Sequence, residues 1–299
     1  MRFMIPKGDF FLQERYIATN NKREKYELIM KENFIHVCFI IDESGSMGGS
    51  ESDIIGGFNK TIEEQKEIKD GKCAVSFFSF NDNVVERFIG KDVNDVQPLE
   101  RGSSLWGGWK YYSSSKSVSI TSTVINGIAD IDITTEKKET NPLYQYSPGG
   151  CTAMNDGIGT AIDKIGKWLS DMPEEERPSK NLIVIMTDGE ENVSKEYTLA
   201  KVQEMIKHQT EKYDWSFIYM GMDITNKKAA DDLGISARSF VAKDSDSLYK
   251  NYSNISTSAS CYRSCANSID ANEALNAYLD AELTADTALY EKKLGRKID

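Results

Sequence analysis

Two short apolar runs in this chain end in the same way, with an aspartate that opens a polar loop. The first run, Val37–Ile41, leads into Asp42, and the second, Leu182–Met186, leads through Thr187 into Asp188. Short, continuous apolar runs are typical of strands buried on both faces of a parallel sheet. In open α/β sheets, ligands bind at the carboxyl ends of such strands. We therefore expect both aspartates to contribute to a binding site.

The loop after the first strand offers only oxygen ligands. Asp42 supplies a carboxylate, and Ser44 and Ser46 supply neutral hydroxyls at every second position. Oxygen ligands suit hard cations, and one or two carboxylates with retained water is the usual arrangement for Mg²⁺. Three donors do not complete an octahedron, so other loops must contribute. Asp188 is one further donor, and the loop 147–152 before an amphipathic helix offers another.

Taken together, these three segments resemble the von Willebrand factor A (vWA) domain and its metal-ion-dependent adhesion site (MIDAS). The resemblance covers roughly residues 34–262, and the chain looks most like the small single-domain vWA proteins of bacteria and bacteriophages. The first three matching residues form an Asp-x-Ser-x-Ser motif, the threonine stands in a separate loop, and the second aspartate belongs to a Thr-Asp-Gly sequence. The residues that match the metal ligands of the family are Asp42, Ser44, Ser46, Thr152 and Asp188.

The resemblance implies a function. In this family, the ion keeps an open position that attracts an anionic oxygen, typically a Glu or Asp of a partner. We therefore expect Mg²⁺, or else Mn²⁺ or Ca²⁺, at the five residues, and a protein partner that supplies a carboxylate to the metal. Glu43, Glu190 and Glu191 flank the site. We interpret them as exposed loop carboxylates, with a role in discouraging nonspecific acidic ligands as the alternative.

The rest of the chain alternates between strand and helix patterns. This alternation predicts an α/β, doubly wound, Rossmann-like fold: a mostly parallel sheet with one antiparallel edge strand and helices on both faces. Further strands are expected at Cys73–Phe80, Val84–Ile89 (the antiparallel edge), Trp215–Met222 and Ser239–Ala242. Helices are expected at Ser52–Lys69, Ala153–Leu169, Lys195–Lys212 and Asn226–Leu233, and from Ser245 onward.

Residues 100–142 interrupt this pattern, and we interpret them as an insertion. Two β-rich runs, Val118–Ile125 and Ile128–Ile133, flank an Asn-Gly pair, which is the strongest short signal for a hairpin. One interpretation is an inserted β-hairpin that decorates the body. The other is a specificity element beside the metal, with Trp106 and Trp109 as anchors of the kind that interfaces favour.

The predicted division of the chain is an N-terminal extension at 1–33, a vWA domain at 34–262 and a C-terminal helix at 263–299. In the last segment, leucines and tyrosines from Leu275 to Leu294 form one helical stripe. We expect this helix to pack on the body, with oligomerisation or partner binding as the alternative.

Charge and apolar content limit the partners and the location. The net charge of −11 argues against nucleic-acid and anionic-membrane binding, which need a basic surface. The chain lacks an apolar run of roughly 18 residues and an apolar signal-peptide stretch near its first residue. We therefore expect a cytoplasmic protein, in the host cytoplasm if it is phage-encoded. Cys261 and Cys265 have the spacing of half a zinc site, but His36 and His208 lie in unrelated contexts, so we interpret these cysteines as structural.

An enzyme is the competing class, because Mg²⁺ beside two aspartates also suits phosphoryl transfer. The sequence contains no Gly-x-x-x-x-Gly-Lys-Ser/Thr loop, no His-Glu-x-x-His and no Gly-x-Ser-x-Gly, and no motif places a general base beside the site. We therefore expect a binding protein and not an enzyme. A structural or regulatory subunit of a phage particle or of an ATPase assembly is the alternative.

Overall fold

A five-stranded sheet in the order β3-β2-β1-β8-β9 forms the centre of the protein. The computed structural model describes residues 34–102, 116–125, 128–137, 141–188, 191–221 and 227–235, and six helical residues between 257 and 275. All neighbouring strands are parallel except β3, which pairs antiparallel with β2 at the edge. The predicted fold class is therefore confirmed. The strands are β1 (Phe34–Asp42), β2 (Lys72–Phe80), β3 (Val84–Asp92), β8 (Lys180–Thr187) and β9 (Ser216–Gly221).

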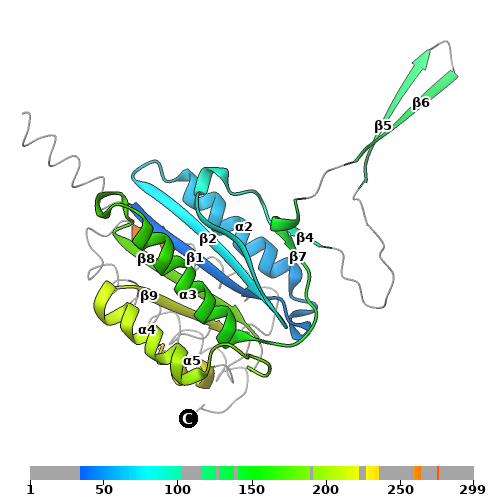
Figure 1. Ribbon diagram of the computed structural model, residues 1–299. Helices are drawn as coiled ribbons and strands as arrows, with labels where there is room; N and C mark the ends of the chain where they lie inside the picture. Colours follow the sequence, from blue (N-terminus) through cyan, green and yellow to red (C-terminus); the bar gives the residue numbers. More distant parts are fainter. Residues whose placement is uncertain are drawn as a thin grey trace, which may run out of the picture.

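Helices cover both faces of this sheet (Figure 1). Along β1, Val37, Phe39 and Ile41 pack in one buried cluster with apolar residues of α2, whereas Cys38 and Ile40 pack in a second cluster with residues of α3 and α4. This two-residue alternation is the pleat of a strand that is buried on both faces. The helices are α2 (Glu51–Glu67), α3 (Met154–Asp171), α4 (Leu199–Tyr213) and α5 (Lys227–Asp232), with short 3-10 turns at Gly45–Met47, Val93–Asp95, Pro142–Tyr144 and Glu174–Glu176.

The order of the strands reverses direction at β1. From β1 the chain passes through α2 to β2 on one side, and it later returns to β8 on the other side of β1. Such a reversal leaves a crevice at the carboxyl ends of the two central strands, where open α/β sheets bind ligands. Because Ile41 of β1 pairs with Met186 of β8, Asp42 and Asp188 both lie at this crevice.

The insertion forms the predicted hairpin. Strands β5 (Lys116–Ile125) and β6 (Ile128–Lys137) pair antiparallel as a separate two-stranded sheet, which extends away from the body in Figure 1. At its base, β4 (Glu100–Arg101) pairs in parallel with β7 (Gln145–Tyr146), and Gly102 N donates to Tyr146 O at 2.9 Å. The two ends of the insertion therefore meet beside the body. The proposed anchors at Trp106 and Trp109 lie outside the described residues.

A helical stretch near the C-terminus packs against the α2 face. Tyr262 and Leu275 are buried in the same cluster as α2. Arg263 is buried and donates to the main-chain oxygens of Gln65, Ile68 and Asp70 at the end of α2, where a cation is favoured. Residues 1–33, the expected strand at 239–242 and both cysteines of the considered zinc pair fall outside the described part of the chain. Within that part, no helix has the length and apolar content to cross a membrane.

Candidate functional site

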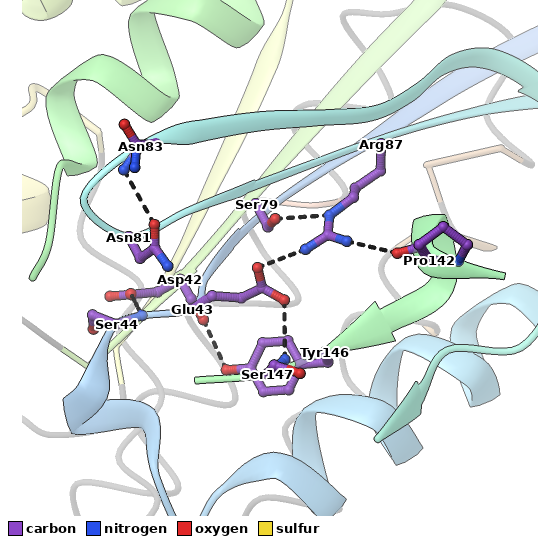
Figure 2. A network of polar contacts seen from close by, with 10 residues as sticks. All are labelled: Asp42, Glu43, Ser44, Ser79, Asn81, Asn83, Arg87, Pro142, Tyr146 and Ser147. Atoms are coloured by element: carbon purple, nitrogen blue, oxygen red, sulfur yellow. Dashed lines mark hydrogen bonds and ion pairs between the residues drawn. The ribbon is translucent and has the colours of Figure 1, made fainter. Parts of the chain in front are cut away.

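Asp42, the last residue of β1, is held by three hydrogen bonds. Its Oδ1 accepts from Ser44 N at 2.6 Å, and its Oδ2 accepts from the Thr187 hydroxyl at 2.6 Å. Its main-chain oxygen accepts from the Tyr146 hydroxyl at 2.7 Å (Figure 2). The side chain is inaccessible to solvent. The carboxylate is therefore fixed in place at the end of the central strand.

A chain of polar contacts joins four of the five predicted ligands. The hydroxyl oxygens of Ser44 and Ser46 lie 3.0 Å apart, and the Ser46 hydroxyl donates to Asp188 Oδ1 at 2.8 Å. Together with the main-chain bond from Ser44 to Asp42, these contacts link the loop after β1 to the loop after β8. The structure thus brings Asp42, Ser44, Ser46 and Asp188 together.

The fifth predicted ligand, Thr152, comes from the loop before α3 and is buried. Main-chain bonds tie this loop to the loop after β1: Gly45 N donates to Gly150 O at 2.9 Å, and Gly149 N donates to Glu43 O at 2.8 Å. Gly150 has a φ of +87°, a conformation that glycine adopts without strain. The threonine loop therefore lies directly against the Asp-x-Ser-x-Ser loop.

Negative charge is concentrated at this site. Burial raises the pKa of Asp42, and the Asp188 charge raises it further, while hydrogen bonds from Thr187 and Ser44 act in the opposite direction. Burial also raises the pKa of Asp188, against the hydrogen bond from Ser46. The pKa of Tyr219 is raised by burial and by both aspartates. The two carboxylates are therefore harder to ionise than usual. A cation bound between them would stabilise their charged forms.

The oxygen spacing fits a small divalent ion. A magnesium–oxygen distance of about 2.0–2.1 Å places adjacent ligands of an octahedron about 2.8–3.0 Å apart. The Ser44–Ser46 and Ser46–Asp188 oxygen pairs have separations of 3.0 and 2.8 Å. Among the described residues, no group of three or more His, Cys, Asp or Glu side chains could hold a metal ion. The oxygens that lie together here belong to hydroxyls and two carboxylates. This oxygen set suits Mg²⁺ in preference to Zn²⁺ or copper.

The prediction that Glu43 is an exposed loop carboxylate is wrong. Its side chain is only 7% exposed and forms an ion pair of 2.6 Å with Arg87 of β3. Glu43 also accepts from Ser147 N at 3.2 Å. Figure 2 shows the Arg87 guanidinium between Glu43, Ser79 and the main-chain oxygen of Pro142, to all of which it donates. Glu43 is buried because a cation and a main-chain N–H compensate its charge.

Glu191 is likewise not a solvated loop carboxylate. It is half-buried, and its two oxygens accept from Asn155 N, Val193 N, and the main chain and hydroxyl of Ser194 at 2.6–3.0 Å. Asn155 lies in the first turn of α3, so Glu191 caps that helix. Glu190 lies outside the described residues.

Sequence reasoning missed the side chains that support the site. Thr187 fixes Asp42, Tyr146 fixes the main chain of Asp42, and Asn192 contacts Thr152. A polar residue at the end of an otherwise apolar strand was the one available signal, and it applies to Thr187. Tyr146 and Asn192 form hydrogen bonds with residues more than 35 positions away in the chain. Nothing in their local sequence indicates these contacts.

No protein-family model and no curated protein matches this chain. Among solved structures, it is similar to proximal thread matrix protein 1 from the mussel byssus (12% identity, TM-score 0.44). It is also similar to a von Willebrand factor type A protein from Catenulispora acidiphila (12%, 0.41) and to the ArnB paralog VWA2 from Sulfolobus acidocaldarius (12%, 0.40). These matches cover 75%, 76% and 74% of this chain but 45%, 42% and 44% of theirs.

This chain therefore spans less than half the length of those structures. The neighbours include proteins named for the vWA domain. The strand order of the central sheet makes the fold described above Rossmann-like. The role of each residue therefore rests on the geometry of this chain alone.

Proposed function

We propose that this chain is a protein-binding module that depends on a divalent metal ion. The observation that carries the proposal is the contact between Ser46 and Asp188. It joins the loops after two neighbouring strands at the switch point of the sheet and sets their oxygens 2.8 Å apart. The buried Asp42 carboxylate and the absence of nitrogen or sulfur donors from the proposed ligand set together favour Mg²⁺, with Mn²⁺ or Ca²⁺ as substitutes.

In this proposal the ion is held by Asp42, Ser44, Ser46, Thr152 and Asp188. The two carboxylates balance its charge, and the neutral hydroxyls leave it electrophilic. When bound, the ion supplies a positive centre for an anionic oxygen of a partner. Thr187 and Tyr146 donate hydrogen bonds to Asp42 and keep it in its orientation. Carboxylates that bind a metal are usually held by hydrogen bonds of this kind.

The partner that this chemistry fits is a protein with an accessible Glu or Asp. Binding, and not catalysis, is the proposed role, because no motif supplies a general base. The acidic net charge of −11 disfavours nucleic acid and anionic membranes as partners.

The test is affinity capture with the full chain, in Mg²⁺ and in chelator, beside Asp188→Ala. The exposed carboxylate of Asp95, in the 3-10 turn Val93–Asp95, provides the matched control Asp95→Ala. A protein that is captured by the wild type and the control in Mg²⁺, and lost on chelation and with Asp188→Ala, supports the proposal. The same protein captured under all conditions would place the interaction away from the metal.

A further inference from the structure

The segment Glu191–Tyr197, here called the strap, lies across the first turn of α3. The Asp156 carboxylate accepts from the main-chain N–H groups of Lys195, Glu196 and Tyr197 at 2.8–2.9 Å. In return, Asp156 N donates to the Ser194 hydroxyl at 3.0 Å. Helix α4 begins at Leu199 and not near the expected Lys195, and the Thr198 side chain caps it by accepting from Lys201 N.

Within the strap, Asn192 pairs with Thr152 in both directions. The Asn192 side-chain oxygen accepts from Thr152 N at 3.0 Å, and Asn192 N donates to Thr152 O at 3.1 Å. Thr152 precedes the first residue of α3, Met154, so the helix itself does not fix it. On one side of Thr152, Gly149 and Gly150 are bonded to the loop after β1, and on the other side Ala153 N donates to Asn81 O at 2.8 Å. The N–H and the C=O of Thr152 itself both bond to Asn192.

The strap also connects two ligand loops. It follows Asp188 by three residues and binds Thr152, which comes from the loop before α3. The loop after β1 is tied to Thr152's own loop by the bond from Gly45 N to Gly150 O. Hydrogen bonds thus join the three ligand loops to one another. The strap is the segment that links the loop of Asp188 to Thr152.

We propose that Asn192 is a positioning residue of the metal site, which holds Thr152 where its hydroxyl can bind the ion. This inference rests on the proposed function, because it assigns a supporting residue to that site. Residues that support a metal ligand are typically worth about 10- to 100-fold in metal affinity, and Asn192 supports Thr152 through its main chain. Asn192 acts through Thr152, so its effect requires the threonine.

The experiment is a titration of the full chain with Mg²⁺, and with Mn²⁺ as the second probe, followed by calorimetry. Asn192→Ala is expected to weaken metal binding about 10-fold. Asn192→Asp keeps the acceptor oxygen for Thr152 N and is expected to bind metal at least as well as the wild type. The matched control is Thr198→Ala, which removes a side-chain bond to Lys201 N in the same connection without contact to Thr152.

A double-mutant cycle separates positioning from a general loss of stability. In a Thr152→Ala background, Asn192→Ala is expected to cause no further loss of affinity. An equal loss in both backgrounds, or an Asn192→Ala variant with wild-type affinity, would overturn the inference. Asp188→Ala in the same series tests the site itself: if it binds Mg²⁺ as the wild type does, the proposed function fails, whereas a loss there with unchanged Asn192→Ala refutes the inference alone.

Discussion

The Ser46 hydroxyl donates to Asp188 Oδ1 across 2.8 Å, although 142 positions separate the two residues in the chain. The contact exists because β1 and β8 are parallel neighbours on either side of the switch point, so their carboxyl ends meet. The hydrogen bond holds the two oxygens at the spacing of adjacent metal ligands. The protein therefore assembles most of its candidate site before any ion binds.

Holding two carboxylates close together should destabilise the metal-free protein. The variant Asp188→Asn, which removes one of the two charges, tests this. Burial raises the pKa of Asp188, and the Asp188 charge raises that of Asp42. Removing this charge is expected to stabilise the metal-free protein by up to about 1 kcal/mol, a modest value because Asp188 is partly solvated. The same change should abolish the rise in melting temperature that we expect Mg²⁺ to cause in the wild type.

Thermal unfolding with and without Mg²⁺ measures both effects. Asp95→Asn is the control, and it should change neither the stability of the metal-free protein nor the shift caused by Mg²⁺. A metal-free Asp188→Asn variant that melts below the wild type, or that keeps the Mg²⁺ shift, would be incompatible with this account.

Stability should also depend on pH through His36. Burial lowers its pKa to about 3, against the hydrogen bond with Asn181, whereas in the unfolded chain the pKa lies near 6.5. The unfolded chain therefore binds more protons between these values. The contribution of His36 to stability is complete above about pH 6.5 and is lost as the pH falls toward 3, by at most about 1.4 kcal/mol per pH unit.

Urea unfolding at about pH 7.5 and about pH 5 tests this prediction. The difference in unfolding free energy between the two pH values should shrink in His36→Gln. The second histidine of the chain, the exposed His208, provides the matched control: His208→Gln should retain the wild-type difference. An unchanged difference in His36→Gln would mean that another group causes the pH dependence.

Removing only one partner of the buried ion pair between Glu43 and Arg87 should strongly destabilise the protein. Replacing Arg87 by Met leaves the Glu43 carboxylate in a site where 7% of its side chain is exposed, which is expected to cost about 3–5 kcal/mol. The double variant Glu43→Gln with Arg87→Met removes the stranded charge and should be more stable than Arg87→Met alone. Denaturant unfolding of the three proteins checks the order, and a double variant that is less stable than the single one would contradict it.

Much of the fold could be predicted because its signals are local. The continuous apolar runs of β1, β2 and β8, the one-sided pattern of α3 and the Asn-Gly pair between β5 and β6 each follow from neighbouring residues. The five proposed ligands could be named because their motifs resemble those of the vWA family. Four of them are linked by polar contacts in the structure.

What could not be predicted depends on partners far away in the chain. Glu43 has the sequence context of a loop residue, and its burial follows from Arg87, 44 positions later. The short pairing of β4 with β7 involves two residues from each strand, too few for a periodic pattern. The course of the chain just before α4 involves Asp156, about 40 positions earlier, which accepts from the main-chain N–H groups of Glu196 and Tyr197.

The insertion should be separable from the metal site. Because β4 and β7 pair at its base and Gly102 N donates to Tyr146 O, residues 103–140 can be replaced by a short Gly-Ser linker without parting the ends. The shortened protein is expected to fold and to bind Mg²⁺ with wild-type affinity. Loss of the captured partner would then favour the hairpin as a specificity element, and full capture would favour a decoration. A shortened protein that folds but no longer binds Mg²⁺ would contradict the separation.

The most direct test of the central claim is a calorimetric titration of the wild-type chain and Asp188→Ala with Mg²⁺, with circular dichroism to confirm that both are folded. We predict one Mg²⁺ per wild-type chain and at least a 10-fold weaker affinity in the variant, since about 10- to 100-fold is lost even for supporting residues. Asp95→Ala should bind as the wild type does. Absence of Mg²⁺ binding by the folded wild type, or equal affinity in Asp188→Ala, would contradict the assignment of the site.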